Sequence, residues 1–410
     1  MKRPIAIGLS PNTEKDDVIL AIRLLFTPWR YIGGNATKEL ERWFRTYFKV
    51  SGAIAFVNAR SALYAILHVL GIGAGDEVLL QAFTCVAVPN AIFATGAKPI
   101  YIDIDTSLNI DPKHLEKHIT KNTKAIIVQH TFAFPAQVDE IKKIAKKHRL
   151  YIIEDCAHTI GAEYKGEKLG TFGIAACFSF GRDKAFSSVF GGMVITNDKD
   201  LQLKLRSYEK QKGFPSYIWV LQQLLYNPVS AMILNFYSFF SLGKVLHFFL
   251  RRFRFFSYPV TANEKDGQFN VREVLRLPNA LAELALLQVR KYKEFNQRRQ
   301  LLAEMYHTLL PQQEVVYNAT VPFLRFPFVT TNKTDIKTYF AKKKIFIGDW
   351  YNQVIDPVGV DLQKVGYIPG SCPEAEKMTK KIINLPTYPT MKKEDAQRVI
   401  EVLKEFQRKD

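Results

Sequence analysis

Hydrophobic residues recur along this chain with two different spacings, which alternate from about residue 37 onward. Segments 36–50 and 61–77 place apolar residues three or four positions apart, as helices do, and the second ends in glycines. Between such segments lie short apolar runs that we predict to be strands: 53–58, 77–82, 98–105, 124–131 and 150–156. Strands that alternate with helices predict an α/β fold with a mostly parallel, doubly wound sheet.

The ends of the predicted strands indicate where a ligand would bind. In sheets of this kind, ligands occupy the crevice beyond the carboxyl ends of the strands. Four segments at the strand ends should therefore approach one crevice: 58–61, 83–85, 130–132 and 154–158. The strand and turn that come next carry Ser179 and Lys184, five residues apart among apolar and aromatic neighbours.

Two local patterns resemble ligand sites but have simpler interpretations. The glycines of 71–77 follow a predicted helix rather than a strand, so they indicate a helix end and a turn instead of a nucleotide loop. His114 and His118 could share one helical face, but the sequence offers them no further ligand. A surface helix is the better interpretation, and we expect no metal site.

The cysteines and the N-terminus favour a cytoplasmic protein. The four cysteines show no short pairing and lie in apolar or mixed runs, which is typical of reduced, buried thiols. They are Cys85, Cys156, Cys177 and Cys372. The first seventeen residues contain no apolar stretch of signal-peptide length, so secretion is not expected.

The formal net charge of +18, from 57 Lys and Arg against 39 Asp and Glu, favours anionic partners. A phosphorylated cofactor, a nucleotide-linked substrate, nucleic acid and an anionic membrane all meet that description. The basic runs 142–149 and 341–346 are typical of solvated helix faces and strand flanks. Because the chain has no repeated basic-aromatic motif, we expect no nucleic-acid partner.

Asp155 and Lys184 are the candidate chemical groups of the crevice. Asp155 ends an apolar strand, where a carboxylate needs a cationic or hydrogen-bonding partner. Lys184 follows the next strand in similar surroundings, which can lower the pKa of an amine and leave it nucleophilic. Chemistry with pyridoxal 5'-phosphate (PLP) requires one such Asp and one such Lys. A buried Asp–Lys ion pair explains the pattern equally well.

Four segments closely resemble the DegT/DnrJ/StrS family of PLP-dependent sugar aminotransferases: 59–92, 103–141, 154–198 and 383–406. The resemblance covers most of the chain outside about 213–262. It implies the PLP-dependent transferase fold of type I, with a large PLP-binding domain over 1–212 and a smaller C-terminal α/β domain over 263–410. It also implies a homodimer with active sites at the subunit interface.

The same resemblance implies a reaction. An amino donor, expected to be glutamate, would give its amino group to a keto sugar attached to a nucleotide, as in surface glycan or glycolipid synthesis. Related dehydratases carry His at the lysine position, so Lys184 favours transamination. The alternative is a non-catalytic PLP-fold scaffold or regulator, because the pocket departs from the family pattern at several positions.

The resemblance assigns roles position by position. Lys184 matches the lysine that binds PLP covalently, and Asp155 matches the carboxylate that faces the pyridine nitrogen. His158 lies where the family often places Gln or His against the cofactor ring. Ser179 matches the hydroxyl that contacts the phosphate. On this reading the serine holds the cofactor and the lysine reacts with it.

Three positions depart from the family pattern. The phosphate turn, usually Gly-Thr, reads Ala59-Arg60, whose backbone amides and guanidinium could still contact phosphate. Cys85 replaces an aromatic residue that often stacks on the ring, so stacking is lost or comes from Phe83 or Phe132. Val274 stands where the partner subunit's Asn often reaches the phosphate, with Asn270 as a loose substitute.

Residues 213–262 form an apolar, aromatic insertion. Positions 213–243 contain no Asp, Glu, Lys, Arg or His, and arginines follow at 251, 252 and 254. The sequence at 226–228, Tyr-Asn-Pro, is expected to break the apolar run into pieces that are short for spanning a bilayer. Segment 213–259 could lie on an anionic membrane at its cytoplasmic face, cover the dimer interface or substrate pocket, or span the membrane, and the sequence leaves these open.

Overall fold

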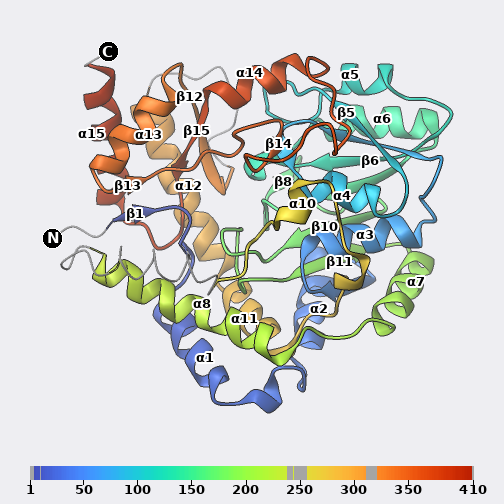
Figure 1. The fold of residues 1–410 in the computed structure, drawn as a ribbon, viewed down its shortest axis with the longest axis horizontal. Helices are drawn as coiled ribbons and strands as arrows, with labels where there is room; N and C mark the ends of the chain where they lie inside the picture. Colours follow the sequence, from blue (N-terminus) through green and yellow to red (C-terminus); the bar gives the residue numbers. More distant parts are fainter. Residues whose placement is uncertain (1–3, 10, 238–242, 244–255, 311–320, 409–410) are drawn as a thin grey trace.

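The computed structural model describes residues 4–9, 11–237, 243, 256–310 and 321–408 (Figure 1). Its centre is a seven-stranded sheet in which β11 is antiparallel to both neighbours and the other strands run parallel. In spatial order the strands are β2 (Gly52–Phe56), β11 (Gly192–Thr196), β10 (Ala175–Ser179), β7 (Tyr151–Asp155), β6 (Thr123–Gln129), β3 (Glu77–Gln81) and β5 (Lys98–Ile102). The five predicted strands are all present in this sheet, so the expected α/β fold is confirmed.

Helices cover both faces of the sheet because side chains of its strands alternate between two hydrophobic cores. On β3, Leu79 packs into the core that includes residues of α5 and α6. Its neighbours Val78 and Leu80 belong to the larger core with α2, α3 and α4. The covering helices are α2 (Ala36–Phe48), α3 (Ala59–Val69), α4 (Ala87–Phe93), α5 (Pro112–Lys117), α6 (Val138–His148) and α7 (Lys199–Lys210).

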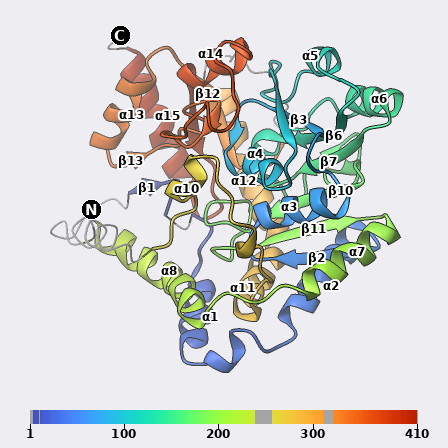
Figure 2. The same ribbon diagram turned by 45° about the vertical axis from the view of Figure 1, so that its right-hand side comes forward.

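The C-terminal part is a second, smaller group of helices around a short sheet. In Figures 1 and 2 the orange and red elements α13, α15 and β12 lie on the side away from α6 and α7. The N-terminal strand β1 pairs with β13 of this group. Its elements are α12 (Tyr292–Leu309), β12 (Arg325–Val329), α13 (Lys333–Lys342), β13 (Ile345–Phe346), α14 (Pro373–Lys381), β15 (Ile382–Pro386) and α15 (Lys393–Gln407). The helix that precedes α12, α11 (Asn279–Arg290), packs instead against α2 and α1. The predicted boundaries at 212 and 263 stay predictions.

Short elements complete the described chain. They are β1 (Ile5–Ala6), α1 (Lys15–Leu25), η1 (Pro28–Arg30), β4 (Thr84–Cys85), η2 (Thr131–Ala133), β8 (Glu163–Tyr164), β9 (Glu167–Lys168), α10 (Ala262–Lys265), η3 (Val271–Glu273) and β14 (Ile355–Asp356). The parallel pair β4–β14 joins Cys85 to Asp356 and so brings the C-terminal part to the main sheet.

Two predicted surface features are confirmed. The helix α3 ends at Val69, and the following glycines form a turn in which Gly71 has φ 75° and Gly75 has φ 90°. The lysines of 142–149 lie exposed on one side of α6, whose Ile141 and Ile144 are buried. The 71–77 segment is therefore a turn, and the 142–149 run is a solvated helix face.

The insertion does not break at 226–228 as predicted, because α8 runs without interruption over Tyr217–Phe236 and contains Pro228. A proline inside a helix removes one hydrogen bond and costs roughly 3 kcal/mol. Burial of Val220, Leu224 and Ile233 on the side of α8 that packs near α1 offsets that loss (Figure 2). Within the described chain, no helix is both long and apolar enough to cross a membrane. The arginines at 251, 252 and 254, which were expected to face an anionic membrane, lie outside the described residues.

Candidate active site

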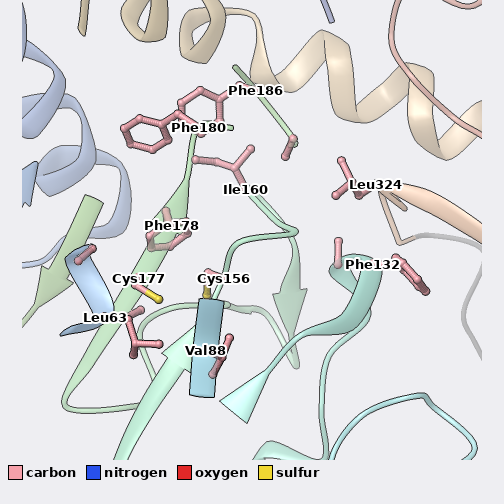
Figure 3. Close-up of a cluster of buried hydrophobic side chains, with 14 of the residues drawn as sticks. Leu63, Val88, Phe132, Cys156, Ile160, Cys177, Phe178, Phe180, Phe186 and Leu324 are labelled. Atoms are coloured by element: carbon pink, nitrogen blue, oxygen red, sulfur yellow. The ribbon is translucent and has the colours of Figure 1, made fainter. Parts of the chain in front are cut away.

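Side chains of β10 alternate between the core and an internal cavity. Phe178 and Phe180 are buried in the core, where the rings of Phe180 and Phe186 lie 4.6 Å apart (Figure 3). Cys177 and Ser179, on the opposite face, line the cavity. The chain then turns back, with the Phe180 amide donating to the Gly191 carbonyl at 2.8 Å. This turn carries Lys184 to the same cavity, which explains a serine and a lysine among aromatic residues.

The cavity has a volume of about 560 Å³, within the range of ~300–1,000 Å³ that is common for small-molecule sites. Three of the four segments that were predicted to meet there contribute to its wall, through 58–60, through Cys85, and through Asp155 with 157–158. The prediction for 130–132 is wrong, because this segment is buried beneath the wall while the preceding Gln129 lines the cavity.

The 130–132 segment turns inward because His130 is a hydrogen-bond partner of the buried carboxylate of Glu154. His130, Glu154 and Cys156 offer ligand atoms within 4.8 Å of one another, the arrangement of a candidate metal site. The Glu154 oxygens, however, accept three backbone N–H bonds of 2.7, 2.7 and 2.9 Å from the loop 170–173. They also accept the Nε2–H of His130 at 3.1 Å, since Nδ1 of His130 accepts from the Ala136 amide. These bonds satisfy the carboxylate without an ion.

Lys184 and Asp155 face the same cavity, yet they form no ion pair within the described chain. Burial lowers the pKa of the Lys184 amine, and its Nζ lies 4.3 Å from the centre of the Trp350 ring. Burial raises the pKa of Asp155, whose Oδ1 accepts the Ala157 amide at 2.9 Å. Both groups are thus available to a ligand in the cavity.

His158 is a neutral side chain of the cavity wall. Its Nδ1 accepts the Phe132 amide at 3.1 Å, so Nε2 carries the proton and donates to the Tyr351 hydroxyl at 3.2 Å. Burial, followed by the positive charge of Lys184, holds the pKa of His158 well below its usual value. The ring stacks on Trp350 at 5.2 Å, with the two planes 12° apart.

The N-terminus of α3 and Ser179 form a cradle suited to a phosphate. Asn58 caps the helix by accepting the Ser61 amide at 2.8 Å, and Ala59 begins it at the cavity wall. The first strand residue of β11, Gly192, approaches so closely that a Cβ there would lie 2.4 Å from the Asn58 backbone. Backbone amides at a helix start bind phosphate well, so these residues fit the phosphate of PLP.

Arg60 lies in the cavity wall next to this cradle, but its guanidinium already has partners. It forms an ion pair with Glu264 and donates to the carbonyl of Pro259. Burial lowers the pKa of Arg60. Contact between Arg60 and a phosphate therefore stays a prediction, and it requires the guanidinium to share or leave Glu264.

The expected ring-stacking substitutes do not reach the cavity. Phe83 and Phe132 are 0% and 1% exposed and contribute nothing to its wall, whereas Trp350 and Tyr351 line it. Cys85 lines it too, and for that reason it is half-buried rather than buried as predicted.

Two positions were expected to reach the cofactor phosphate of a partner subunit, and neither lines the cavity of its own chain. Val274 is 1% exposed and lies in the core. Asn270 lies on the surface, where its side chain caps η3 by accepting the Arg272 amide at 3.1 Å. A contribution of either residue to a partner subunit stays a prediction.

Sequence reasoning missed several residues of the cavity wall. They come from the insertion and from the C-terminal part: Tyr226, Tyr258, Trp350, Tyr351, Asp356 and Lys265. The aromatic and proline-rich 226–228 and 256–259 segments were a signal, but only of an apolar surface. Nothing in the sequence near 350 indicates the pairing of β14 with β4 that brings Asp356 here.

Asp356 gives the fold a pH dependence. Burial raises its pKa to about 6, so its contribution to stability is full below about pH 4 and is lost as pH rises through 6. We expect Asp356→Asn to be more stable than the wild type at pH 7.5, by roughly 2–3 kcal/mol, and to lose this advantage toward pH 4.5. Urea unfolding at both pH values measures it, and a difference that does not change with pH would contradict the assignment.

The family model of DegT/DnrJ/EryC1/StrS aminotransferases matches residues 12–216 and 250–404. This chain belongs to that family. It is a family of PLP-dependent sugar aminotransferases, and the relatives of this chain include proteins named for nucleotide-linked sugars, a GDP-perosamine synthase and a UDP-N-acetyl-3-dehydro-alpha-D-glucosamine 3-aminotransferase. The family predicted from the sequence is thereby confirmed. The segment skipped by the match, 217–249, contains all of α8.

Two relatives and one solved structure illustrate what this chain is similar to. A "Pleiotropic regulatory protein" of Geobacillus stearothermophilus is 30% identical over 414 residues and covers 98% of both chains. GDP-perosamine synthase of Caulobacter vibrioides is 37% identical over 208 residues, 50% of this chain and 56% of that protein. The solved structure of PseC, an aminotransferase of pseudoaminic acid biosynthesis in Helicobacter pylori, aligns with a TM-score of 0.76 at 22% identity and covers 99% and 100% of the two chains.

Proposed function

We propose that this protein is an active aminotransferase that moves the amino group of glutamate to a nucleotide-linked keto sugar. The observation that carries the proposal is the placement of Lys184 and Asp155 in one cavity without an ion pair between them. A pair with a purely structural role would close that space, because each buried charge needs the other.

The residues of the cavity fit PLP, and each has a role in the proposal. The α3 N-terminus and Ser179 would hold the phosphate, and Asp155 the protonated ring nitrogen. When bound, PLP supplies an electron sink for the bond changes of transamination. Lys184 would hold the cofactor through its amine and, with that amine free, would accept and donate protons at Nζ. Burial lowers the pKa of this amine, which favours its unprotonated form.

The experiment is a half-reaction. Purified protein is loaded with PLP, and its visible absorption band is followed after glutamate is added without a sugar. Loss of the band, with release of 2-oxoglutarate, supports the proposal. A protein that stays colourless with PLP, or keeps its band in glutamate, glutamine and other amino donors, would overturn it.

A regulator or scaffold without catalysis is the second candidate. It is favoured by one observation, the full-length relative with the name "Pleiotropic regulatory protein". The same half-reaction separates the two, because a scaffold that binds PLP would keep its band when the donor is added. The retained Lys184, Asp155 and Ser179 in one cavity support the enzyme.

We further infer that the protein is a homodimer at the cytoplasmic face of a membrane. The apolar side chains on the outer face of α8 support a membrane contact, since Ile218 is 80% exposed, Met232 41% and Phe236 47%. Insertion of such side chains into a lipid interface contributes about 1.5–3 kcal/mol each. A location beside glycan or glycolipid synthesis would follow from such docking.

Liposome co-sedimentation tests the membrane contact. We expect the wild type to bind vesicles with anionic lipid and to lose binding in high salt. The double variant Ile218→Glu, Met232→Glu should bind at least about 10²-fold more weakly. Leu203→Glu is the matched control, because Leu203 is 67% exposed on α7, away from the insertion. If the wild type stays in the supernatant and the double variant is monomeric, the exposed apolar face of α8 is a dimer contact and the membrane proposal is wrong.

A further inference from the structure

Arg182 is a cation in the cavity wall that forms no ion pair within the described residues. Its Nη2 donates to the Ser257 hydroxyl at 2.6 Å and lies 3.5 Å from Oε1 of Gln223. The guanidinium carbon lies 4.1 Å from the centre of the Tyr226 ring and 5.5 Å from that of Phe190. Its Nε is buried with no hydrogen-bond partner among the described residues.

The carboxylates nearby are occupied by other cations. Asp183, the next residue, pairs with Arg325 at 2.6 Å. Glu264 pairs with Arg60. Within the described chain, no carboxylate forms an ion pair with Arg182. A guanidinium withdrawn from water normally needs an anion as its partner. Because no carboxylate of the described chain pairs with Arg182, the anion of a ligand could be that partner.

The insertion builds this setting. Gln223 and Tyr226 lie on α8, and Ser257 lies near the end of the insertion. Ser257 in turn donates to Oε1 of Gln223 at 2.9 Å, which fixes the two groups relative to each other. Tyr226, Tyr258 and the 259–260 segment line the cavity beside Arg182. One side of the insertion is therefore a wall of the site that contains Lys184.

The anion that fits Arg182 is a phosphate of the acceptor rather than that of the cofactor or a carboxylate of the donor. The cofactor phosphate has its own cradle at α3 and Ser179. All members of a transaminase family must accept an amino donor, whereas their sugar nucleotides differ, as the names of a GDP-perosamine synthase and a UDP-sugar 3-aminotransferase among the relatives show. A wall built by α8, which the family model does not match, therefore suits the acceptor. The rings of Phe190, Tyr226 and Tyr258 offer flat surfaces to a base.

We propose that Arg182, oriented by Gln223, Tyr226 and Ser257 of the insertion, binds the diphosphate of the nucleotide-linked acceptor. The inference rests on the proposed function and adds to it the residue that selects the substrate class. Planar guanidinium groups bind phosphate oxygens with two parallel hydrogen bonds, which an ammonium group cannot do.

Calorimetric titration of the PLP-loaded protein tests this directly, with UDP, GDP, dTDP and inorganic pyrophosphate as probes. We expect at least one nucleoside diphosphate to bind the wild type, and Arg182→Gln to weaken that binding by about 10–100-fold, the effect of one charge-assisted contact. Arg182→Lys should recover only part of the loss. The matched control Arg23→Gln removes an exposed arginine of α1 and should bind the probe as the wild type does.

The outcomes separate this inference from the proposed function. If the glutamate half-reaction is impaired in Arg182→Gln while nucleotide binding is intact, Arg182 holds the donor carboxylate and the inference is wrong. It is also wrong if none of the four probes binds, or if Arg182→Gln binds them normally. A protein that never acquires the PLP band refutes the proposed function instead. The nucleotide titration of the cofactor-free protein then still tests whether Arg182 binds the diphosphate. Should Arg182→Gln misfold, Gln223→Leu tests the same setting, with a smaller expected loss.

Discussion

Lys184→Ala should lose the visible absorption band of the PLP-loaded protein and slow the glutamate half-reaction by at least about 10³-fold. The expected loss is large because one amine performs two tasks, covalent attachment of the cofactor and proton transfer during the reaction. Burial already lowers the pKa of this amine, so the protein prepares it for both tasks. Absorption spectra and single-turnover measurements with glutamate give the two readouts.

A second lysine of the same cavity is the matched control. Lys265 lines the cavity, and its Nζ donates to the Val358 carbonyl at 2.7 Å. Lys265→Ala should keep the band and the half-reaction, because the Lys265 amine is engaged with the Val358 carbonyl and has no role in the proposed chemistry. A band that survives Lys184→Ala and disappears in Lys265→Ala would show that the wrong lysine has been assigned. Unfolding measurements on both variants exclude a general loss of structure.

The central sheet could be predicted from local patterns because each of its strands is a short apolar run that ends in polar residues. The run that contains Ile153 ends in Asp155, and both residues take the predicted places in β7. In strands buried on both faces, hydrophobicity alone carries the signal. Segment 130–132 shows the limit, since its inward turn depends on the buried Glu154, whose need for partners cannot be read from the sequence.

Residues that come from distant parts of the chain could not be predicted. Trp350 and Tyr351 reach the cavity through a pairing between β4 and β14, two strands of two residues each, which are too short to leave a periodic pattern. The helix through Pro228 was missed for a related reason. A proline argues against a helix locally, while the packing of Leu224 and Ile233 decides the outcome in three dimensions.

The insertion illustrates how one segment can serve two surfaces. Its composition indicated an apolar element but left membrane, dimer and pocket roles open. In the structure the inner side of α8 supplies Tyr226 to the cavity wall and places Gln223 beside Arg182, and the outer side exposes Ile218 and Met232. Substrate recognition and surface docking are therefore compatible, because they use different sides of one helix. Substitutions on each side can test them separately.

Asp155→Asn should reduce the rate of the glutamate half-reaction by about 10²–10³-fold while the protein stays folded and still binds PLP through Lys184. In the cofactor-free protein, burial raises the pKa of Asp155, which favours the neutral acid. A protonated pyridine nitrogen beside it would favour the carboxylate instead, as an opposite charge does in any buried pair. The amide of Asn can accept the Ala157 hydrogen bond but cannot supply the charge.

The pH dependence distinguishes this role from a structural one. Wild-type affinity for PLP should fall as the medium becomes acidic enough to protonate Asp155, and this decline should be absent in Asp155→Asn. Asp356→Asn is the matched control, since Asp356 is also a buried carboxyl group of the cavity wall but its Oδ1 accepts the Asn352 amide and it has no role in the proposed reaction. It should retain both the rate and the acid decline of PLP binding. An Asp155→Asn protein with the wild-type rate and the same decline would show that Asp155 does not control the charge of the ring.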